Sequence, residues 1–351
     1  MHKFNLVRVG WTDLNSSYLE WILQQDFNLS IYVQDTIYNK ETDILVVSRP
    51  EFFNNDILIK FLSDGFKVIL ANLWEARPFL LARDFEPYLD NILVVLGCKN
   101  SFDYGWKHII NVPNWFWYNE SLWYTCDKNF QYHEYIPNRT NTKLFFMPIK
   151  RSKPFRTAIV DKFKDVLDNA TWSYVERWCD GKHLVTKENN PVARIGWDRQ
   201  FESNWYNDTY FSVAVETCYG NTDPIKEQNG IVSDECCPAE LFITEKTYKP
   251  IAHQHPFMSM GMKGTLAHLR LMGFETYEHI FDESYDDLDF FEDRLEVVYN
   301  NIINFDRSKY LNPLTEQKIK HNYDKFYDRA QVLNGVKSEL ITPTLEWIHA
   351  T

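Results

Sequence analysis

The run Thr244-Glu245-Lys246 combines the groups that hold a phosphate-bearing ligand. Threonine is a good helix N-cap because its hydroxyl accepts a backbone N–H of the first turn, so Thr244 predicts a helix that begins at Glu245. The N–H groups and the positive dipole end of such a helix favour a diphosphate. Lys246 adds a full charge where lysine otherwise opposes the dipole, and Glu245 can accept hydrogen bonds from ribose hydroxyls. The alternative is an ordinary capped helix with solvated charges.

Three segments occur in a fixed order along the second half of the chain. They are Glu216-Thr217, Phe242-Ile-Thr-Glu-Lys-Thr-Tyr-Lys-Pro-Ile251 and Pro256-Phe-Met-Ser-Met-Gly261. This order resembles the α1,3-fucosyltransferase family, whose members carry an E-N-S segment, a Y-V-T-E-K segment that opens a helix, and a strand that ends in glycine. The resemblance covers mainly residues 143 to 287. The chain departs from the family pattern at Thr217, where the family has asparagine, at Phe242, where it has an aromatic hydroxyl, and in a polar insertion, 221 to 237.

The resemblance implies a nucleotide-sugar site. In the family, the glutamate of the Thr-Glu-Lys segment contacts the ribose and the lysine contacts the diphosphate. An arginine that follows the interdomain linker also contacts the diphosphate, and the similar segment here, 143 to 156, offers two. A guanidinium suits this role because it binds phosphate oxygens bidentately. The residues expected to bind the nucleotide sugar are Arg151, Arg156, Glu216, Thr244, Glu245 and Lys246.

A carboxylate in the first half of the chain is the candidate catalytic base. Glu75 follows the apolar run Val68–Leu70, so we expect it at the end of a parallel strand, facing a cleft. Direct displacement of a nucleoside diphosphate needs a base for the acceptor's proton, and an apolar wall such as Trp74 can raise a carboxyl pKa for that role. Asp103 is the second choice. The alternative for Glu75 is an ordinary carboxylate at a helix start.

Two sets of residues have the types that bind metals, and we expect no metal at either. Asp287 and Asp289 have the D-x-D form of metal-dependent glycosyltransferases, but they precede a helix, where the dipole favours acidic residues anyway. A zinc site is the other possibility, although the cysteines lack C-x-x-C spacing. Its ligands would come from Cys218, Cys236, Cys237, His253 and His255. We therefore expect no cofactor beyond the nucleotide-sugar donor.

The elements that would position these residues alternate between strands and helices. In the first half, apolar runs rich in Val, Ile and Leu lack strict alternation, as expected for parallel strands covered on both faces. They are Leu6–Gly10, Leu29–Val33, Ile44–Ser48, Lys67–Asn72, Ile92–Gly97 and His108–Val112. Helices are expected between them at Ser16–Gln25 and Asn55–Asp64. Strands separated by helices predict a Rossmann-like sheet.

A polar segment, 137 to 142, is predicted to link this sheet to a second α/β set. The expected strands there are Leu144–Pro148, Trp172–Trp178, Phe211–Thr217 and Phe257–Met260, with helices at Phe155–Leu167, Glu245–Ala252 and Thr265–Met272. Beyond Leu288 only helices are expected, with breaks near Asn312-Pro313 and Gly335. The predicted fold is α/β of the GT-B type. A Rossmann-like acceptor domain, 1–140, faces a Rossmann-like nucleotide-sugar domain with a helical tail, 141–351, across a cleft.

Composition excludes several functional classes. The net charge of −12 disfavours nucleic acid and anionic membranes as partners, although a local basic cleft remains compatible with it. The chain has no run of about 18 apolar residues and no secretory signal, so we expect a cytoplasmic protein with reduced thiols and no membrane insertion. It also lacks the motifs of P-loop NTPases, dinucleotide-binding dehydrogenases, zinc proteases and serine hydrolases.

The sequence therefore predicts an inverting, metal-independent glycosyltransferase. It would move a sugar from a nucleotide-diphosphate donor to a glycan or other hydroxyl acceptor. A DNA base as acceptor would suit a viral enzyme, but the charge of −12 argues against duplex binding. A carbohydrate- or nucleotide-binding protein without catalysis is the third hypothesis, and turnover of a nucleotide sugar separates it from an enzyme.

Overall fold

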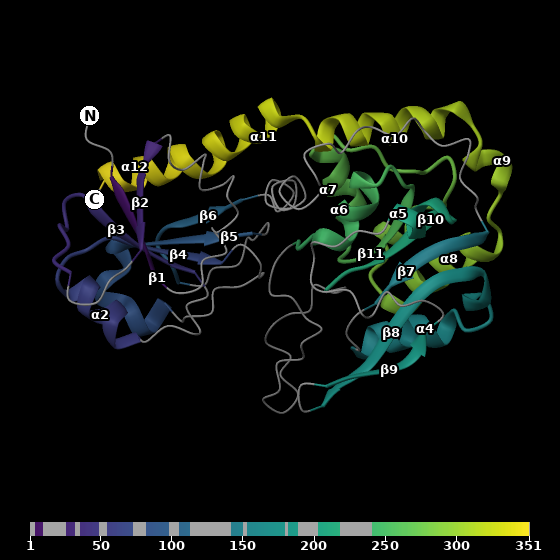
Figure 1. Cartoon of the computed structure of the whole chain (residues 1–351), viewed down its shortest axis with the longest axis horizontal. Helices are drawn as coiled ribbons and strands as arrows, with labels where there is room; N and C mark the ends of the chain where they lie inside the picture. Colours follow the sequence, from purple (N-terminus) through teal and green to yellow (C-terminus); the bar gives the residue numbers. More distant parts are fainter. Residues whose placement is uncertain are drawn as a thin grey trace. The chain divides into compact units, whose positions relative to one another are not determined.

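The computed structural model divides into two α/β units (Figure 1). The first unit comprises Met1–Tyr124, Pro238–Glu240 and Arg329–Thr351, and the second comprises Thr125–Cys237 and Leu241–Asp328. The residues that the structure describes are 4–9, 26–31, 36–48, 55–72, 82–97, 105–112, 142–149, 153–179, 182–188, 203–217 and 241–350.

In the described part of the first unit, six strands form one sheet in the order β2-β1-β3-β4-β5-β6. They are β1 (Asn5–Val9), β2 (Asn28–Ile31), β3 (Asp43–Ser48), β4 (Val68–Asn72), β5 (Ile92–Leu96) and β6 (Ile109–Asn111). All neighbouring pairs are parallel. The whole of β5 is buried, which explains its run of Ile, Leu and Val without alternation. All six strands expected from the apolar runs are confirmed, with ends that differ by at most two residues.

In the described residues, two helical segments connect strands of this sheet. Helix α2 (Asn55–Ser63) buries Leu58 and confirms the helix expected between β3 and β4. The 3-10 segment η3 (Ala82–Asn91) between β4 and β5 was outside the sequence prediction, because Pro87 interrupts any helical pattern there. The helix expected at Ser16–Gln25 lies outside the described residues.

The last three helical elements of the chain belong to the first unit. They are α11 (Arg329–Val336), the π-helical turn η7 (Lys337–Ile341) and α12 (Thr342–Ala350). Lys67, just before β4, donates a hydrogen bond to the carbonyl of Ile348, and its ammonium lies 5.5 Å from the ring centroid of Trp347. The sequence predicts domains 1–140 and 141–351. The division of the structure by contacts instead places Arg329–Thr351 in the first unit.

Of the two breaks expected in the C-terminal helices, the structure confirms one. The side chain of Asn312 accepts the N–H of Leu314 and caps α10 (Pro313–Phe326). The break expected near Gly335 is wrong, because this glycine lies inside α11 and the helical path continues into η7. Glycine costs a helix only about 1 kcal/mol relative to alanine, and α11 buries the side chain of Val332.

In the described part of the second unit, five strands form a sheet in the order β11-β10-β7-β8-β9. They are β7 (Lys143–Pro148), β8 (Ala170–Cys179), β9 (Lys182–Glu188), β10 (Thr209–Val215) and β11 (Phe257–Met260). All pairs are parallel except β8 with β9. The four parallel strands confirm the sequence prediction, whereas β9 was missed because its sequence is mostly polar.

Helices accompany this sheet (Figure 1). They are α4 (Pro154–Lys162), η4 (Leu167–Asn169), α5 (Ser203–Asn207), α6 (Glu245–Ala252), α7 (Thr265–Leu271), η6 (Ser284–Asp286), α8 (Phe291–Ile303), α9 (Arg307–Tyr310) and α10. Contacts join α4 to α8, and α6 to both β10 and α10. The three helices expected between residues 155 and 272 are confirmed as α4, α6 and α7, although α4 ends earlier than expected.

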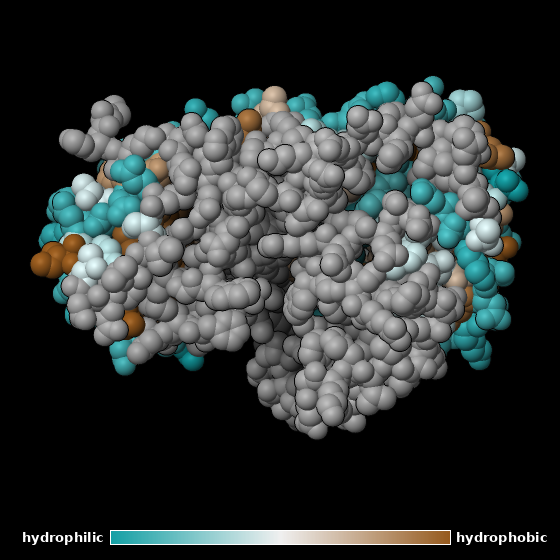
Figure 2. Space-filling model, viewed as in Figure 1, coloured by the Kyte–Doolittle hydropathy of each residue, from teal (hydrophilic) through white to brown (hydrophobic). Residues whose placement is uncertain are grey.

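Aromatic rings fill the core of the second unit. Phe211 of β10 stacks on Phe145 of β7 with ring centroids 5.9 Å apart, and it meets Phe281 edge-on at 5.1 Å. All three side chains are buried, so they serve packing rather than ligand stacking. On the face shown in Figure 2, the described surface is mainly hydrophilic with separate apolar side chains. None of the described helices is long and apolar enough to cross a membrane.

Candidate functional site

The strand order of the second sheet reverses between β7 and β10. The chain passes from β7 to β8 on one side, and β10 lies on the other side of β7 and leads outward to β11. In open α/β sheets, ligands bind beside the carboxyl ends of the strands at such a reversal. The residues that follow β7 and β10 here are Lys153, at the start of α4, and Glu216 with Thr217.

Glu216 is fully buried and ties the end of β10 to the first turn of α6. Its Oε1 accepts the N–H of Thr244 at 3.1 Å and the hydroxyl of Thr247 at 2.6 Å. Its Oε2 accepts the hydroxyl of Thr244 at 2.5 Å and the N–H of Thr217 at 3.3 Å. Four donors match the acceptor capacity of a carboxylate, so Glu216 positions the neighbouring residues in this structure.

The network around Glu216 continues to the next strand. Because Thr247 donates its hydroxyl proton to Glu216, the contact of 3.1 Å between Thr247 and Ser259 requires the Ser259 hydroxyl to donate. The backbone N–H of Ser259 donates in turn to the hydroxyl oxygen of Tyr285, at 3.2 Å. These contacts fix α6 relative to β10 and β11, and therefore fix the direction in which the first turn of α6 points.

Gly261, directly after β11, lies against this network. A β-carbon on Gly261 would be 3.0 Å from Cγ of Glu216 and 3.1 Å from Oγ1 of Thr265. Both neighbours are buried, so neither can move away easily. This close approach is the physical reason for a glycine at the end of β11.

Lys246 occupies the first turn of α6, as the sequence predicts. Thr244 is the N-cap, and its Oγ1 accepts the N–H of Lys246 at 3.4 Å. The ammonium of Lys246 donates to Oε1 of Glu245 at 2.7 Å, and to Oγ1 of Thr244 and of Thr217, both at 3.2 Å. The side chain of Lys246 keeps 24% of its surface exposed. The sequence prediction thus located the charge correctly but missed Thr217 as its partner.

Glu245 is the counter-ion of Lys246 and is only 15% exposed. Burial alone would raise the carboxyl pKa of Glu245. The charges of Lys246 and Lys249 and the hydrogen bond from Lys246 outweigh that effect and lower the pKa to about 2. Glu245 is therefore a firmly ionised acceptor beside the helix start, in a position from which it could also accept ribose hydroxyls.

Arg156 and Lys153 differ in what they offer a ligand. Arg156 is 4% exposed, and its Nη2 donates to the backbone carbonyl of Glu216 at 2.7 Å. Lys153 is half-buried, and its ammonium donates to the carbonyl of Thr217 at 3.0 Å. The sequence prediction named Arg156 and missed Lys153, although its place before Pro154 at the first helical position was a usable signal.

The charges around Thr217 sum to a positive value. Among the described residues, four cationic side chains lie near Thr217, Glu216 or Glu245, against the two carboxylates of Glu216 and Glu245, which leaves a formal excess of two positive charges within this described set. The four are Lys153, Arg156, Lys246 and Lys249. The net charge of the whole chain is −12, so this end of the sheet is a local basic region on an acidic protein.

The start of α7 is capped by a carboxylate, whereas in the first turn of α6 the N–H of Lys246 bonds the hydroxyl of Thr244. The carboxylate of Asp286 accepts the N–H groups of Leu266 and Ala267, each at 3.0 Å. A negatively charged side chain of the protein therefore already neutralises this helix end.

The described members of the two sets with metal-binding residue types have other surroundings. Asp287 and Asp289 are exposed, and Asp289 pairs with Lys263 at 2.5 Å. In the part of the chain that the structure describes, no group of three or more His, Cys, Asp or Glu side chains could hold a metal ion. The cysteines proposed as zinc ligands, Cys218, Cys236 and Cys237, lie outside the described residues.

The two histidines near the end of α6 have structural partners. Nε2 of His255 lies 2.9 Å from the carbonyl oxygen of Thr209, so this nitrogen carries the proton. Nδ1 of His255 then accepts the hydroxyl of Ser212 at 2.8 Å. The ring of His253 stacks on Tyr206 with centroids 4.2 Å apart. Both side chains therefore contribute to packing.

Three of the predicted site residues lie outside the described residues. They are the candidate bases Glu75 and Asp103 and the candidate phosphate ligand Arg151. In the sequence, Glu75 follows the end of β4 by three residues, and Asp103 follows β5, the neighbouring strand.

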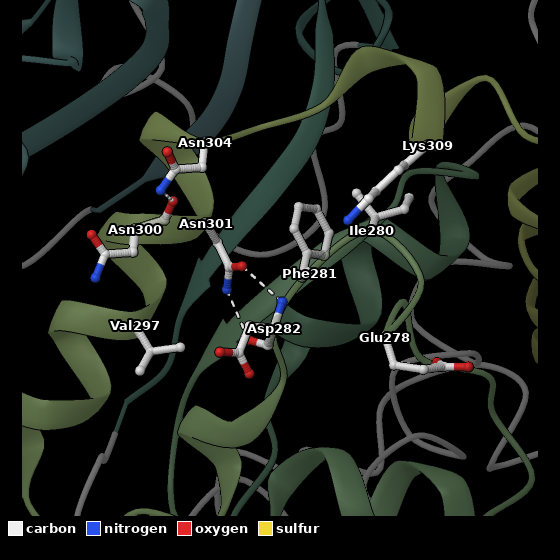
Figure 3. Close-up of a pocket in the computed structure, with 9 residues that line it drawn as sticks. All are labelled: Glu278, Ile280, Phe281, Asp282, Val297, Asn300, Asn301, Asn304 and Lys309. Atoms are coloured by element: carbon white, nitrogen blue, oxygen red, sulfur yellow. Dashed lines mark hydrogen bonds between the residues drawn. The ribbon is translucent and has the colours of Figure 1, made fainter.

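A pocket of about 440 Å³ lies elsewhere in the second unit (Figure 3). Its wall includes Phe281, which packs on Phe211 near the start of β10, whereas Glu216 follows the end of that strand. The amide of Asn301 accepts the N–H of Asp282 at 2.7 Å and donates to its carbonyl at 2.8 Å. Asn301 and Asp282 therefore bond each other within the unit, and the pocket is separate from the basic region.

Comparison with known proteins adds no relative to this picture. A scan against protein-family models found none that matches the chain, and a search of curated proteins also found no match.

Proposed function

We propose that this chain is a glycosyltransferase that binds a nucleotide-diphosphate sugar at the carboxyl end of β10. The observation that carries the proposal is the ammonium of Lys246, held in the first turn of α6 and bonded to Thr217 directly after β10. The helix dipole and this charge act on the same point, where the strand order reverses. A diphosphate is the ligand chemistry that such a point suits best.

The same groups would assist the departure of a nucleoside diphosphate. Breaking the bond between the sugar and the diphosphate places additional negative charge on the leaving oxygen. Lys246 and the positive end of the α6 dipole would stabilise that charge, because they are fixed before the reaction begins. Glu245 would accept the ribose hydroxyls, as the resemblance to α1,3-fucosyltransferases implies.

The acceptor side of the proposal rests on the first unit. A GT-B glycosyltransferase combines two Rossmann-like units, and this chain has two parallel sheets of that kind. In the proposed reaction Glu75, or Asp103 in its place, takes the proton of an acceptor hydroxyl. The hydroxyl oxygen attacks the anomeric carbon opposite the diphosphate, so the product has inverted configuration. The acceptor class is a glycan or another hydroxyl compound.

A screen followed by a transfer assay tests this function. Nucleotide-diphosphate sugars that differ in base and sugar are first ranked by the shift they cause in the unfolding temperature. The nucleotide-diphosphate sugar that binds is then incubated with the protein and candidate acceptors. The products are analysed by mass spectrometry and by NMR of the anomeric proton. Transfer with inversion supports the proposal. Binding without transfer or hydrolysis would favour a carbohydrate- or nucleotide-binding protein without catalysis, and transfer with retention would exclude the proposed mechanism.

A further inference from the structure

Two ammonium groups reach the same residue from different helices. Lys246, in the first turn of α6, donates to Oγ1 of Thr217 at 3.2 Å. Lys153, which precedes α4, donates to the carbonyl oxygen of Thr217 at 3.0 Å. Because both acceptors belong to one residue, the two positive charges are close neighbours. Like charges repel, and the carboxylate of Glu245, 2.7 Å from the ammonium of Lys246, offsets one of the two charges.

Arg156 cannot take the role that Lys153 has in this arrangement. Its guanidinium is buried and donates to the carbonyl of Glu216, which fixes α4 to the end of β10. Lys153 is half-buried and lies one residue before α4, so part of this residue is exposed. The contact with Thr217 holds the ammonium without enclosing it.

We propose that Lys153 is the second cationic ligand of the diphosphate, and that the site selects two linked phosphoryl groups over a single phosphate. The inference rests on the proposed function and specifies its anion-binding half. Each ammonium would contact one phosphoryl group, and Thr217 would separate the two contacts. Arg156 is a positioning residue, which acts through the backbone of Glu216 and Thr217.

Titration with inorganic pyrophosphate and inorganic phosphate tests this inference on the full chain. Wild type should bind pyrophosphate at least tenfold more tightly than phosphate. Lys153→Ala and Lys246→Ala should each weaken pyrophosphate binding by about tenfold to a hundredfold, since each removes one charge-assisted contact. Lys153→Arg should recover most of the affinity, because it restores the charge. Lys164→Ala, an exposed lysine just after α4, is the matched control and should bind like wild type.

The outcomes separate this inference from the proposed function. If Lys153→Ala binds pyrophosphate as wild type does while Lys246→Ala does not, the role of Lys153 is wrong and the proposed function stands. Equal affinity of wild type for phosphate and pyrophosphate contradicts the selectivity. If wild type binds neither pyrophosphate nor any nucleotide sugar, the proposed function itself fails. Unfolding temperatures identify a variant that fails to fold, and Lys153→Gln, which keeps a donor without the charge, then replaces it.

Discussion

Lys246 is held in place by acceptors of the protein itself. An ammonium has three donors, and Glu245, Thr244 and Thr217 each accept a hydrogen bond from it. A diphosphate would have to share or replace these acceptors. The neutral threonines can be shared at little cost, whereas Glu245 carries a negative charge beside the ligand. Glu245 therefore keeps Lys246 oriented in the absence of ligand and lowers the intrinsic affinity for a bare anion.

Glu245→Gln tests the ionised state of this carboxylate. The folded pKa of about 2 lies below the ordinary value of 4.5, so ionised Glu245 stabilises the fold above that ordinary value. This contribution is lost as pH falls from about 4.5 toward 2. The unfolding temperature of wild type should therefore fall more over this range than that of Glu245→Gln. Glu292→Gln is the control, because Glu292 is an exposed acid in the first turn of α8. If the unfolding temperatures of Glu292→Gln and Glu245→Gln depend on pH in the same way, Glu245 has no special role.

At the scale of residues, the sequence could predict local features but not contacts between residues far apart in the chain. The N-cap at Thr244 and the place of Lys246 depend on adjacent residues, and both are as expected. The role of Glu216 as the acceptor of four donors depends on residues up to 31 positions away, which no local pattern reveals. Arg156 was expected at a phosphate because its residue type suits one, whereas its burial depends on tertiary packing.

At the scale of elements, the start of α6 is positioned by contacts with two strands. Glu216 links α6 to the end of β10, and the hydroxyls of Thr247 and Ser259 link α6 to β11. Gly261 allows Glu216 to occupy its position, because any side chain there would meet Cγ of Glu216. The direction of the first turn of α6 therefore depends on a residue that has no polar side chain of its own.

Gly261→Ala should disturb both stability and ligand binding. The added methyl group overpacks a buried site, for which a cost of about 1–3 kcal/mol in free energy of unfolding is typical. Because Glu216 must shift, the affinity for the nucleotide sugar should also fall. Gly264→Ala is the matched control: its φ of +80° makes alanine unfavourable, but no atom lies within 4 Å of the added carbon. Denaturant unfolding and ligand titration should show lost stability in both variants and lost affinity in Gly261→Ala alone. An equal loss of affinity in both would refute the argument.

The elements themselves were largely predictable from the sequence. Buried parallel strands have continuous apolar runs, and the ten parallel strands in the described residues were all expected. The polar strand β9 and the proline-containing η3 escaped prediction because neither has the pattern of a regular element. The packing of α11 and α12 in the first unit could not be foreseen, since their apolar positions do not identify the sheet that they cover.

At the scale of the whole molecule, an acidic protein carries a local basic region. The net charge is −12, yet the part of the cluster around Thr217 that the structure describes has more cations than carboxylates. Such an arrangement attracts a small anion by short-range contacts while the remaining surface disfavours polyanions. It is consistent with a nucleotide sugar as ligand and argues against duplex DNA as the acceptor.

Chelation of divalent ions should leave glycosyl transfer unchanged. Lys153, Lys246 and the positive end of the α6 dipole would neutralise the departing diphosphate, which is the task that a divalent ion performs in metal-dependent enzymes. Initial rates measured with and without EDTA should agree within error. Loss of activity on chelation, with recovery on addition of Mn²⁺ or Mg²⁺, would instead implicate Asp287 and Asp289.

Glu75→Gln should bind the donor normally and transfer the sugar far more slowly. The amide keeps the shape of the side chain but cannot accept a proton, and general base catalysis typically contributes about 10²- to 10⁴-fold. Donor affinity from titration and single-turnover rates separate the two effects. Asp103→Asn is the companion variant. Normal transfer by Glu75→Gln together with slow transfer by Asp103→Asn would move the base to Asp103.

The most direct test of the central claim is the affinity of wild type and Lys246→Ala for a nucleotide-diphosphate sugar, measured by calorimetry. The donor is the one that raises the unfolding temperature of wild type in the screen. Loss of a charge-assisted contact corresponds to roughly 1.5–3 kcal/mol, so Lys246→Ala should bind about tenfold to a hundredfold more weakly. The variant should still fold, with a lower unfolding temperature in the absence of ligand because Glu245 loses its counter-ion. Lys263→Ala, an exposed lysine paired with Asp289, should bind like wild type. Equal affinity in wild type and Lys246→Ala would contradict the account.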